Sequence, residues 1–170
     1  MLEYFQLNLI KFMELFMGLF TKKIEIKSPI KGKLIDITEV KDEAFSSKAL
    51  GDGMAIIPED GKIFSPVNGE VVTMIDTNHA IGLEAKGVEI LIHIGMDTVK
   101  LQGKHFKSYV KEGHKVKEGT LLIEFDKEVV EKEYDITSPI IISNFAELKE
   151  CVKTEPRDVE VGDLIMTITK

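Results

Sequence analysis

The sequence predicts a mainly β protein, an antiparallel β-sandwich or barrel with internally duplicated motifs and a few short helices. Short runs of β-branched and aliphatic residues recur from Lys22 onward, separated by Gly, Pro, Asn or Asp. From Lys22 onward, no long segment keeps the 3.6-residue spacing of apolar residues that an amphipathic helix requires. Two different short motifs also occur twice, which favours a duplicated architecture.

Eight runs predict strands, because each combines β-branched residues with turn-forming residues at its ends. The predicted strands are Ile24–Ile26, Lys33–Ile37, Met54–Ile57, Glu70–Ile75, Val88–Ile94, Thr120–Phe125, Ile140–Ser143 and Leu164–Thr169. The predicted short helices are Lys104–Val110, Lys127–Glu133 and Asn144–Val152. Asn144 is a natural N-cap for the last helix, with Glu147 three residues later as in a capping box.

The repeated motifs consist of turn residues that lead into strands. The segment SPIKG at residues 28–32 recurs as SPVNG at residues 65–69, and SPI at residues 138–140 repeats its start without the glycine. The segment VKEGTLL at residues 116–122 matches VEVGDLI at residues 159–165. Because two distinct patterns recur, we favour duplication over chance reuse of turn residues.

Composition and charge exclude several classes of protein. The chain has 22 Lys plus Arg against 29 Asp plus Glu, a formal net charge of −7, which argues against nucleic-acid binding. A hydrophobic content of 44% suits a globular protein with a real core. The single cysteine, Cys151, excludes an internal disulfide and a cysteine-rich metal site, so we expect a cytoplasmic protein.

Residues 1–20 form an apolar N-terminal extension to a domain of residues 21–170. The extension lacks the basic start and small-residue cleavage site of a secretory signal, and charged residues break the apolar run that a membrane span needs. Two interpretations stay open. The extension is an amphipathic helix that contacts a membrane surface or a partner, or residues 1–16 are untranslated and Met17 is the start.

Two of the four histidines, His79 and His93, face each other if the segment between them is a hairpin. A three-residue loop at residues 85–87 pairs Glu84 with Val88 and therefore His79 with His93. Directly opposite residues have Cβ atoms about 5 Å apart. The face toward the core then carries Ala80, Val88, Ile90, Ile92 and Ile94.

Three interpretations of this histidine pair compete. The histidines are packed without a chemical role, or they bind a metal, although two ligands are fewer than zinc normally has in proteins. In the third interpretation one neutral imidazole is a nucleophile in phosphoryl transfer, and the second donates a hydrogen bond to the developing charge. Thr77 adds a hydroxyl group to the same face.

Several motifs resemble one known family. Residues 87–99, GVEILIHIGMDTV, resemble the signature of the glucose-class enzyme IIA of the bacterial phosphoenolpyruvate-dependent sugar phosphotransferase system. Residues 77–80 resemble its second-histidine motif, and Gly51-Asp52-Gly53 resembles its glycine turn. Residues 62–69 and 138–144 match further family segments, so the resemblance covers the chain except for the N-terminal extension.

The resemblance implies a barrel-sandwich hybrid fold built from duplicated motifs. It also implies that His93 accepts the phosphoryl group through Nε2, that His79 is an auxiliary histidine, and that Thr77 is their polar companion. The residues that match partner-docking positions of the family are Asp42, Phe45, Ile75, Leu91 and Asp97. Ile75 and Leu91 replace aromatic residues of the best-known members, whereas His105 and His114 match no family site and are expected at the surface.

The implied activity is that of a phosphotransferase component. Its phosphohistidine intermediate receives a phosphoryl group from the phosphocarrier protein HPr and passes it to the cysteine of an enzyme IIB domain. The resemblance also implies regulatory binding to targets such as glycerol kinase or sugar permeases, with zinc shared between a partner and the pair of His79 and His93. We expect a monomer that needs no cofactor, with weak membrane-surface contact through residues 1–20.

A lipoyl carrier is the alternative. Residues 113–119, followed by residues 124–127, resemble a lipoyl-carrier pattern in which a lysine at a hairpin tip carries lipoate, here Lys127. Such a domain would leave much of the chain unexplained. Shared turn chemistry of the two folds accounts for the likeness.

Overall fold

The computed structural model describes residues 22–170, and the helix predicted within residues 1–20 lies outside this range. All strand pairs in the described range are antiparallel, as predicted. The strands are β1 (Lys23–Lys27), β2 (Gly32–Asp36), β3 (Asp52–Pro58), β4 (Lys62–Phe64), β5 (Gly69–Met74), β6 (Ala80–Ala85), β7 (Val88–His93), β8 (Phe106–Ser108), β9 (Lys115–Val116), β10 (Leu121–Phe125), β11 (Ser138–Ile142), β12 (Glu150–Lys153), β13 (Asp158–Val159) and β14 (Leu164–Thr169). The helical segments are η1 (Ile37–Glu39), α2 (Glu43–Ser46), η2 (Thr98–Leu101), α3 (Lys127–Val130) and η3 (Phe145–Glu147).

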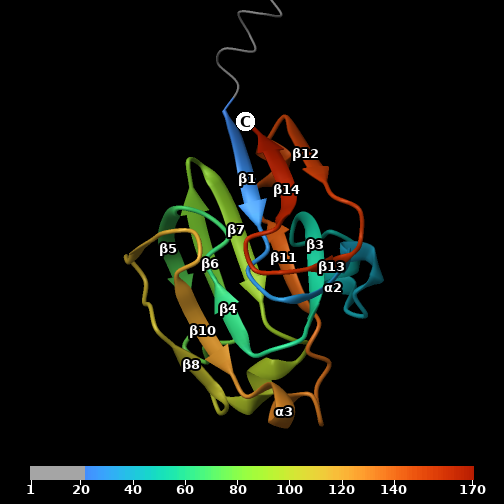
Figure 1. Cartoon of the computed structure of the whole chain (residues 1–170), viewed down its shortest axis with the longest axis vertical. Coiled ribbons are helices and arrows are strands. Elements are labelled where there is room, and N and C mark those ends of the chain that lie inside the picture. The colour runs from blue at the N-terminus through green and yellow to red at the C-terminus, as the bar shows by residue number, and fades with distance from the viewer. Residues whose placement is uncertain (1–21) are drawn as a thin grey trace, which may run out of the picture.

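Three sheets build the β-sandwich, and Figure 1 shows their arrangement. The largest has eight strands in the order β13-β2-β3-β11-β7-β6-β5-β9. The other two have three strands each, in the orders β1-β14-β12 and β4-β10-β8. All eight predicted strands are present, with ends that differ by one or two residues in most cases.

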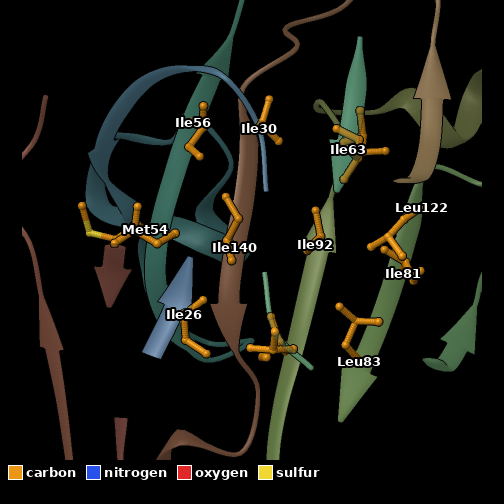
Figure 2. Packing of buried hydrophobic residues seen from close by; sticks show 14 of the residues in the cluster. Ile26, Ile30, Met54, Ile56, Ile63, Ile81, Leu83, Ile92, Leu122 and Ile140 are labelled. Atoms are coloured by element: carbon orange, nitrogen blue, oxygen red, sulfur yellow. The ribbon is translucent and has the colours of Figure 1, made fainter. Parts of the chain in front are cut away.

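The main core lies on the inner face of the large sheet. Met54, Ile140, Ile92 and Ile81 oppose one another across the neighbouring strands β3, β11, β7 and β6, and each is at most 1% exposed. Figure 2 shows these side chains with Ile26 and Leu83 in the same layer of packing. Full burial of each such side chain contributes about 1.5–3 kcal/mol relative to exposure, so this row of residues fixes the register of the sheet.

The duplication predicted from the sequence is present as two matching sets of backbone hydrogen bonds. Residues 28–34, which begin with the first Ser-Pro segment, bond to residues 157–163, and residues 65–71, which begin with the second, bond to residues 114–120 in the same way. Three hydrogen bonds of the first set each have an equivalent in the second. Ser28 N to Asp163 O corresponds to Ser65 N to Thr120 O. Gly162 N to Ser28 O corresponds to Gly119 N to Ser65 O, and Leu34 N to Arg157 O corresponds to Val71 N to His114 O. The two sets also interlock, through Lys27 N to Pro66 O and Phe64 N to Pro29 O.

The predicted helix Lys104–Val110 is wrong. The chain there passes through left-handed residues at Gln102, Gly103 and His105 and then forms strand β8. Phe106 is buried opposite Phe125 of β10, with the two rings stacked at 5.9 Å between centroids. Cross-strand packing of this aromatic pair overrides the weak helical propensity of the segment.

The predicted helix Asn144–Val152 is also wrong, apart from the single turn η3. The Asn144 side chain caps no helix, because its Oδ1 accepts a hydrogen bond from Glu89 N and its Nδ2 donates to Gly87 O. The following residues form β12, which pairs with β14. The helix predicted at Lys127–Glu133 is confirmed as the shorter α3, capped by Asp126, whose carboxylate accepts from Val129 N.

A smaller apolar cluster lies on the outer face of the large sheet. Its buried members are Ile35, Ile37, Val40, Phe45, Ala55 and Ile141, with Leu91 and Met96 packed against them. Helix α2, which the sequence analysis missed, covers this cluster, and its N-cap Asp42 accepts a hydrogen bond from Ala44 N. The helix has only four residues, too few for a periodic signal in the sequence.

Candidate functional site

The hairpin of β6 and β7 has a different register from the predicted one. Lys86 and Gly87 both have positive φ, 52° and 82°, which makes a two-residue loop of the tight type that matches strand twist. Ala85 therefore pairs with Val88, and His93 opposes Ala80 rather than His79. The predicted place of Ala80 on the inner face is wrong, since it shares the outer face with His93, while Ile81 and Leu83 face the core.

The two histidines meet nonetheless, because His79 precedes strand β6. The turn from β5 to β6 has a left-handed residue at Asn78, with φ of 55°, and Asn78 N donates to Ile75 O. Because His79 lies in this turn, the alternation of side chains along β6 does not determine where its side chain points. The imidazoles of His79 and His93 lie edge to face, with 5.0 Å between ring centroids and an interplanar angle of 81°.

A backbone carbonyl orients the ring of His93. Nδ1 of His93 lies 2.8 Å from the Gly95 carbonyl oxygen, which can only accept, so Nδ1 carries the proton and donates. In the neutral ring, Nε2 is then the unprotonated nitrogen with a free lone pair. Phe45 of α2 packs against the ring at 5.1 Å between centroids.

The hydroxyl of Thr77 orients the second ring, with 2.6 Å between its Oγ1 and Nδ1 of His79. Within residues 22–170, no protein group is hydrogen-bonded to Nε2 of His79 or His93, yet every fully buried side-chain nitrogen or oxygen has a partner. Both Nε2 atoms are therefore open to solvent. Both imidazoles are thus held at Nδ1, and each leaves its Nε2 without a protein partner in the described part of the chain.

Burial keeps both imidazoles neutral. Desolvation, together with the smaller effect of the neighbouring His93, lowers the pKa of His79 to about 4. Desolvation also lowers the pKa of His93, against the opposing effects of the Gly95 hydrogen bond and the Asp42 carboxylate. At neutral pH, a neutral imidazole with a free nitrogen is a nucleophile, as phosphoryl or acyl transfer requires.

The predicted docking residues lie at different depths around the pair. Phe45 is only 4% exposed, so its contact is with His93 and the outer cluster, whereas Ile75 is 39% exposed and Leu91 is half-buried. Asp42 lies close enough to His93 to act on its pKa. Asp97 is exposed, has a φ of 59°, and forms an ion pair with Lys100 at 3.1 Å.

Gly95, whose carbonyl orients His93, was part of the quoted signature but had no role assigned from the sequence. Its signal is a glycine two residues after His93, where the chain needs a left-handed conformation, here with φ of 70°. His105 and His114 are exposed and, as expected, are not part of the pair. Within residues 22–170, no group of three or more His, Cys, Asp or Glu is arranged to bind a metal.

Comparison with known proteins decides the family. A profile of the phosphoenolpyruvate-dependent sugar phosphotransferase system, EIIA 1, matches residues 24–148. The chain belongs to this EIIA family. It is therefore a phosphotransferase component that carries phosphoryl groups in sugar transport.

Relatives of this EIIA chain are both separate and fused proteins. The chain is 38% identical over 166 residues to the glucose-specific EIIA component of Haemophilus influenzae, with 91% of this chain and 99% of that protein covered. It is 46% identical over 151 residues to a beta-glucoside-specific EIIBCA component of Halalkalibacterium halodurans, covering 88% of this chain. The chain spans only 24% of that fused protein.

The solved structure of the glucose permease IIA from Mycoplasma capricolum has the same fold. Its TM-score is 0.78 at 39% identity, with 86% of this chain and 96% of that one covered. This likeness confirms the predicted β-sandwich of the glucose IIA type. In the described part of this EIIA chain, no helix has the length and apolar character needed to cross a membrane.

The lysine of the lipoyl alternative has a different setting from the one that lipoate attachment requires. Lys127 is the first residue of α3 and forms an ion pair with Glu131, with 2.5 Å between Nζ and Oε2. It does not stand at the tip of a hairpin between two strands. This position argues against a lipoyl carrier.

Proposed function

We propose that His93 is the phosphorylated residue, that HPr is the donor, and that the cysteine of an enzyme IIB domain is the acceptor. The observation that supports this assignment is the hydrogen bond from Nδ1 of His93 to the Gly95 carbonyl, which leaves Nε2 as the nucleophile. Fused EIIBCA relatives, in which an EIIB part belongs to the same polypeptide as EIIA, support the choice of acceptor.

In the first step, the lone pair of His93 Nε2 attacks the phosphorus of the donor phosphohistidine. A P–N bond to Nε2 forms, the P–N bond to the donor imidazole breaks, and its electron pair returns to that ring. In the second step, a thiolate of enzyme IIB attacks the phosphorus and a P–S bond forms. The P–Nε2 bond then breaks, and its electron pair restores the neutral His93 imidazole.

His79 supports the phosphoryl group in the second step, its transfer from His93 to enzyme IIB. Its ring lies within 5.0 Å of the His93 ring, so an Nε2–H of His79 can reach an oxygen of a group bound at His93. When Thr77 Oγ1 donates to Nδ1 of His79, the proton of the neutral ring stays on Nε2. A donor aimed at oxygens whose charge grows in the transition state lowers the barrier.

Acidic and apolar residues around the pair form the docking surface. Asp42 and Asp97 attract basic side chains of HPr and enzyme IIB, and Ile75 with Leu91 supplies apolar contact. The same surface is the place for regulatory targets such as glycerol kinase or sugar permeases. A carboxylate from such a partner would complete a shared zinc site with His79 and His93, since the isolated pair offers two ligands.

Phosphorylation by purified enzyme I and HPr with phosphoenolpyruvate tests this proposal. We expect one acid-labile phosphate per chain by mass spectrometry, located on His93, and none in His93→Gln. His114→Gln is the matched control, because His114 is exposed and outside the pair. Phosphate uptake by His93→Gln at the wild-type rate would refute the assignment.

A further inference from the structure

The identity of the nucleophilic nitrogen depends on one backbone carbonyl. If the Gly95 oxygen turned away from Nδ1 of His93, the neutral ring could place its proton on Nε2, which would remove the lone pair. The peptide units on both sides of Gly95 must therefore keep a fixed orientation. A set of contacts in the structure holds these two peptide units in one orientation.

Both peptide units are held at both of their ends. In the Ile94–Gly95 unit, the Ile94 carbonyl accepts from Thr98 Oγ1 at 2.5 Å, and Gly95 N donates to Ser138 Oγ at 3.4 Å. In the next unit, the Gly95 carbonyl accepts from His93, and Met96 N donates to the Asp135 carbonyl at 2.7 Å. Rotation of either unit would break two hydrogen bonds together.

The hydroxyl groups that hold the first unit have no access to water. Thr98 and Ser138 are both 0% exposed, and Ser138 Oγ also donates to the Ile136 carbonyl at 2.9 Å. An added Cβ on Gly95 would lie 2.7 Å from Thr98 Cγ2 and 2.9 Å from the Asp135 carbonyl. The turn is therefore packed closely from the η2 side and from the segment before β11.

Ser138 differs here from the other two Ser-Pro motifs. Ser28 Oγ donates to the Ile30 carbonyl and Ser65 Oγ to the Val67 carbonyl, in each case two residues ahead and at 2.7 Å. Ser138 Oγ instead donates two residues back, to Ile136, and its oxygen accepts from Gly95 N. The hydroxyl that completes a local turn in two copies of the motif holds the His93 turn in the third.

We infer that Thr98 and Ser138 are positioning residues for phosphoryl transfer, which fix the Gly95 carbonyl and through it the Nδ1–H tautomer of His93. This inference rests on the proposed role of His93 as acceptor. It assigns a function to two buried hydroxyl groups, neither of which contacts the phosphoryl group. Their effect reaches the reaction through the orientation of a single peptide carbonyl.

Thr98→Val and Ser138→Ala test the inference, because each removes a hydroxyl with little change of shape. We expect the rate of phosphate uptake from HPr to fall about 10-fold, since small displacements of a reacting group can cost up to about 100-fold. The ¹⁵N chemical shifts of the His93 imidazole should show a larger fraction of the Nε2–H tautomer. Thr98→Ser and Ser138→Thr keep the hydroxyl and should restore both properties.

Ser65→Ala is the matched control, because it removes a buried hydroxyl from the equivalent motif away from His93. It should lower the melting temperature as Ser138→Ala does but leave uptake and tautomer unchanged. The inference would be overturned if Thr98→Val and Ser138→Ala had the same rate of phosphate uptake and the same tautomer fraction of His93 as Ser65→Ala. Failure of the proposed function gives a different result, namely phosphate uptake by His93→Gln. The tautomer of His93 is measured in the absence of phosphate, so it tests the inference independently of that result.

Discussion

The ring of His79 meets the ring of His93 edge to face, although the strand register opposes His93 to Ala80. The left-handed Asn78 lies just before β6 and allows His79 to leave the alternation of the strand. The pair is thus formed by one strand residue and one turn residue. Their surroundings differ accordingly, since His79 is held by the Thr77 hydroxyl and His93 by a backbone carbonyl.

His79→Gln should separate the two half-reactions. His93 keeps its nucleophilic nitrogen, so phosphate uptake should persist, whereas transfer to enzyme IIB should fall about 100-fold because a donor to the transition-state charge is lost. Rapid-quench measurement of each step checks this. Thr77→Val, which removes only the hydroxyl partner of His79, should reduce transfer less. Phosphate attached to His79 in the wild-type protein would reverse the two roles.

The burial of His79 should make stability depend on pH. Its pKa is about 4 in the folded chain and about 6.5 when unfolded, so the unfolded state binds more protons between these values. Stability is therefore complete above pH 6.5 and falls as the pH drops toward 4, by at most about 1.4 kcal/mol per pH unit for one group. Urea unfolding at several pH values measures this slope. His79→Gln should flatten it and the exposed His114→Gln should not; equal slopes in all three proteins would contradict the explanation.

The isolated chain should bind zinc only weakly. His79 and His93 supply two ligands, fewer than the three or four that hold zinc in proteins. After dialysis against a mild chelator, metal analysis should find much less than one zinc per chain. One zinc per chain would show that the isolated protein completes the site, and its loss in His79→Gln would locate that site at the pair.

A chain that begins at Met17 should fold and accept phosphate as the full chain does. Every residue of the proposed site lies after Met17, and so does each of the described strands. The check is phosphate uptake from HPr together with co-sedimentation on anionic vesicles, where we expect any binding by the full chain to decrease. Loss of folding or of uptake would place residues 1–16 in the structural core.

The alternation of apolar residues predicted the strands, because burial of one face dictates it. Periodicity could not give the hairpin register, which depended on whether Ala85 belonged to the loop, and a positive φ at Lys86 decided it. The false helices at residues 104–110 and 144–152 have weak local propensity that cross-strand pairing overrides. Helix α2 was missed because its four residues are stabilised by Phe45 packing and an Asp42 cap.

The candidate site, like the fold, could be predicted only in part from the sequence. The two histidines and Thr77 were chosen from a hairpin register that is wrong and from the family resemblance. The two imidazole rings nonetheless come together, with Thr77 bonded to His79. The contacts that Ser138 and Asp135 make with the Gly95 turn could not be found, because Ser138 is 43 residues from Gly95 and Asp135 is 39 residues from Met96. Side chains that act through distant backbone groups leave no local pattern in a sequence.

The interlocked repeats have a consequence for how the chain folds. The first two copies of the Ser-Pro motif are each completed by a segment far along the chain, residues 157–163 for the first copy and residues 114–120 for the second, and β1 pairs with β14. Pairings between such distant segments raise the contact order and slow folding. During synthesis at about 5–20 residues per second, the first half leaves the ribosome with unpaired strand edges. The first motif closes only when almost the whole chain has been made.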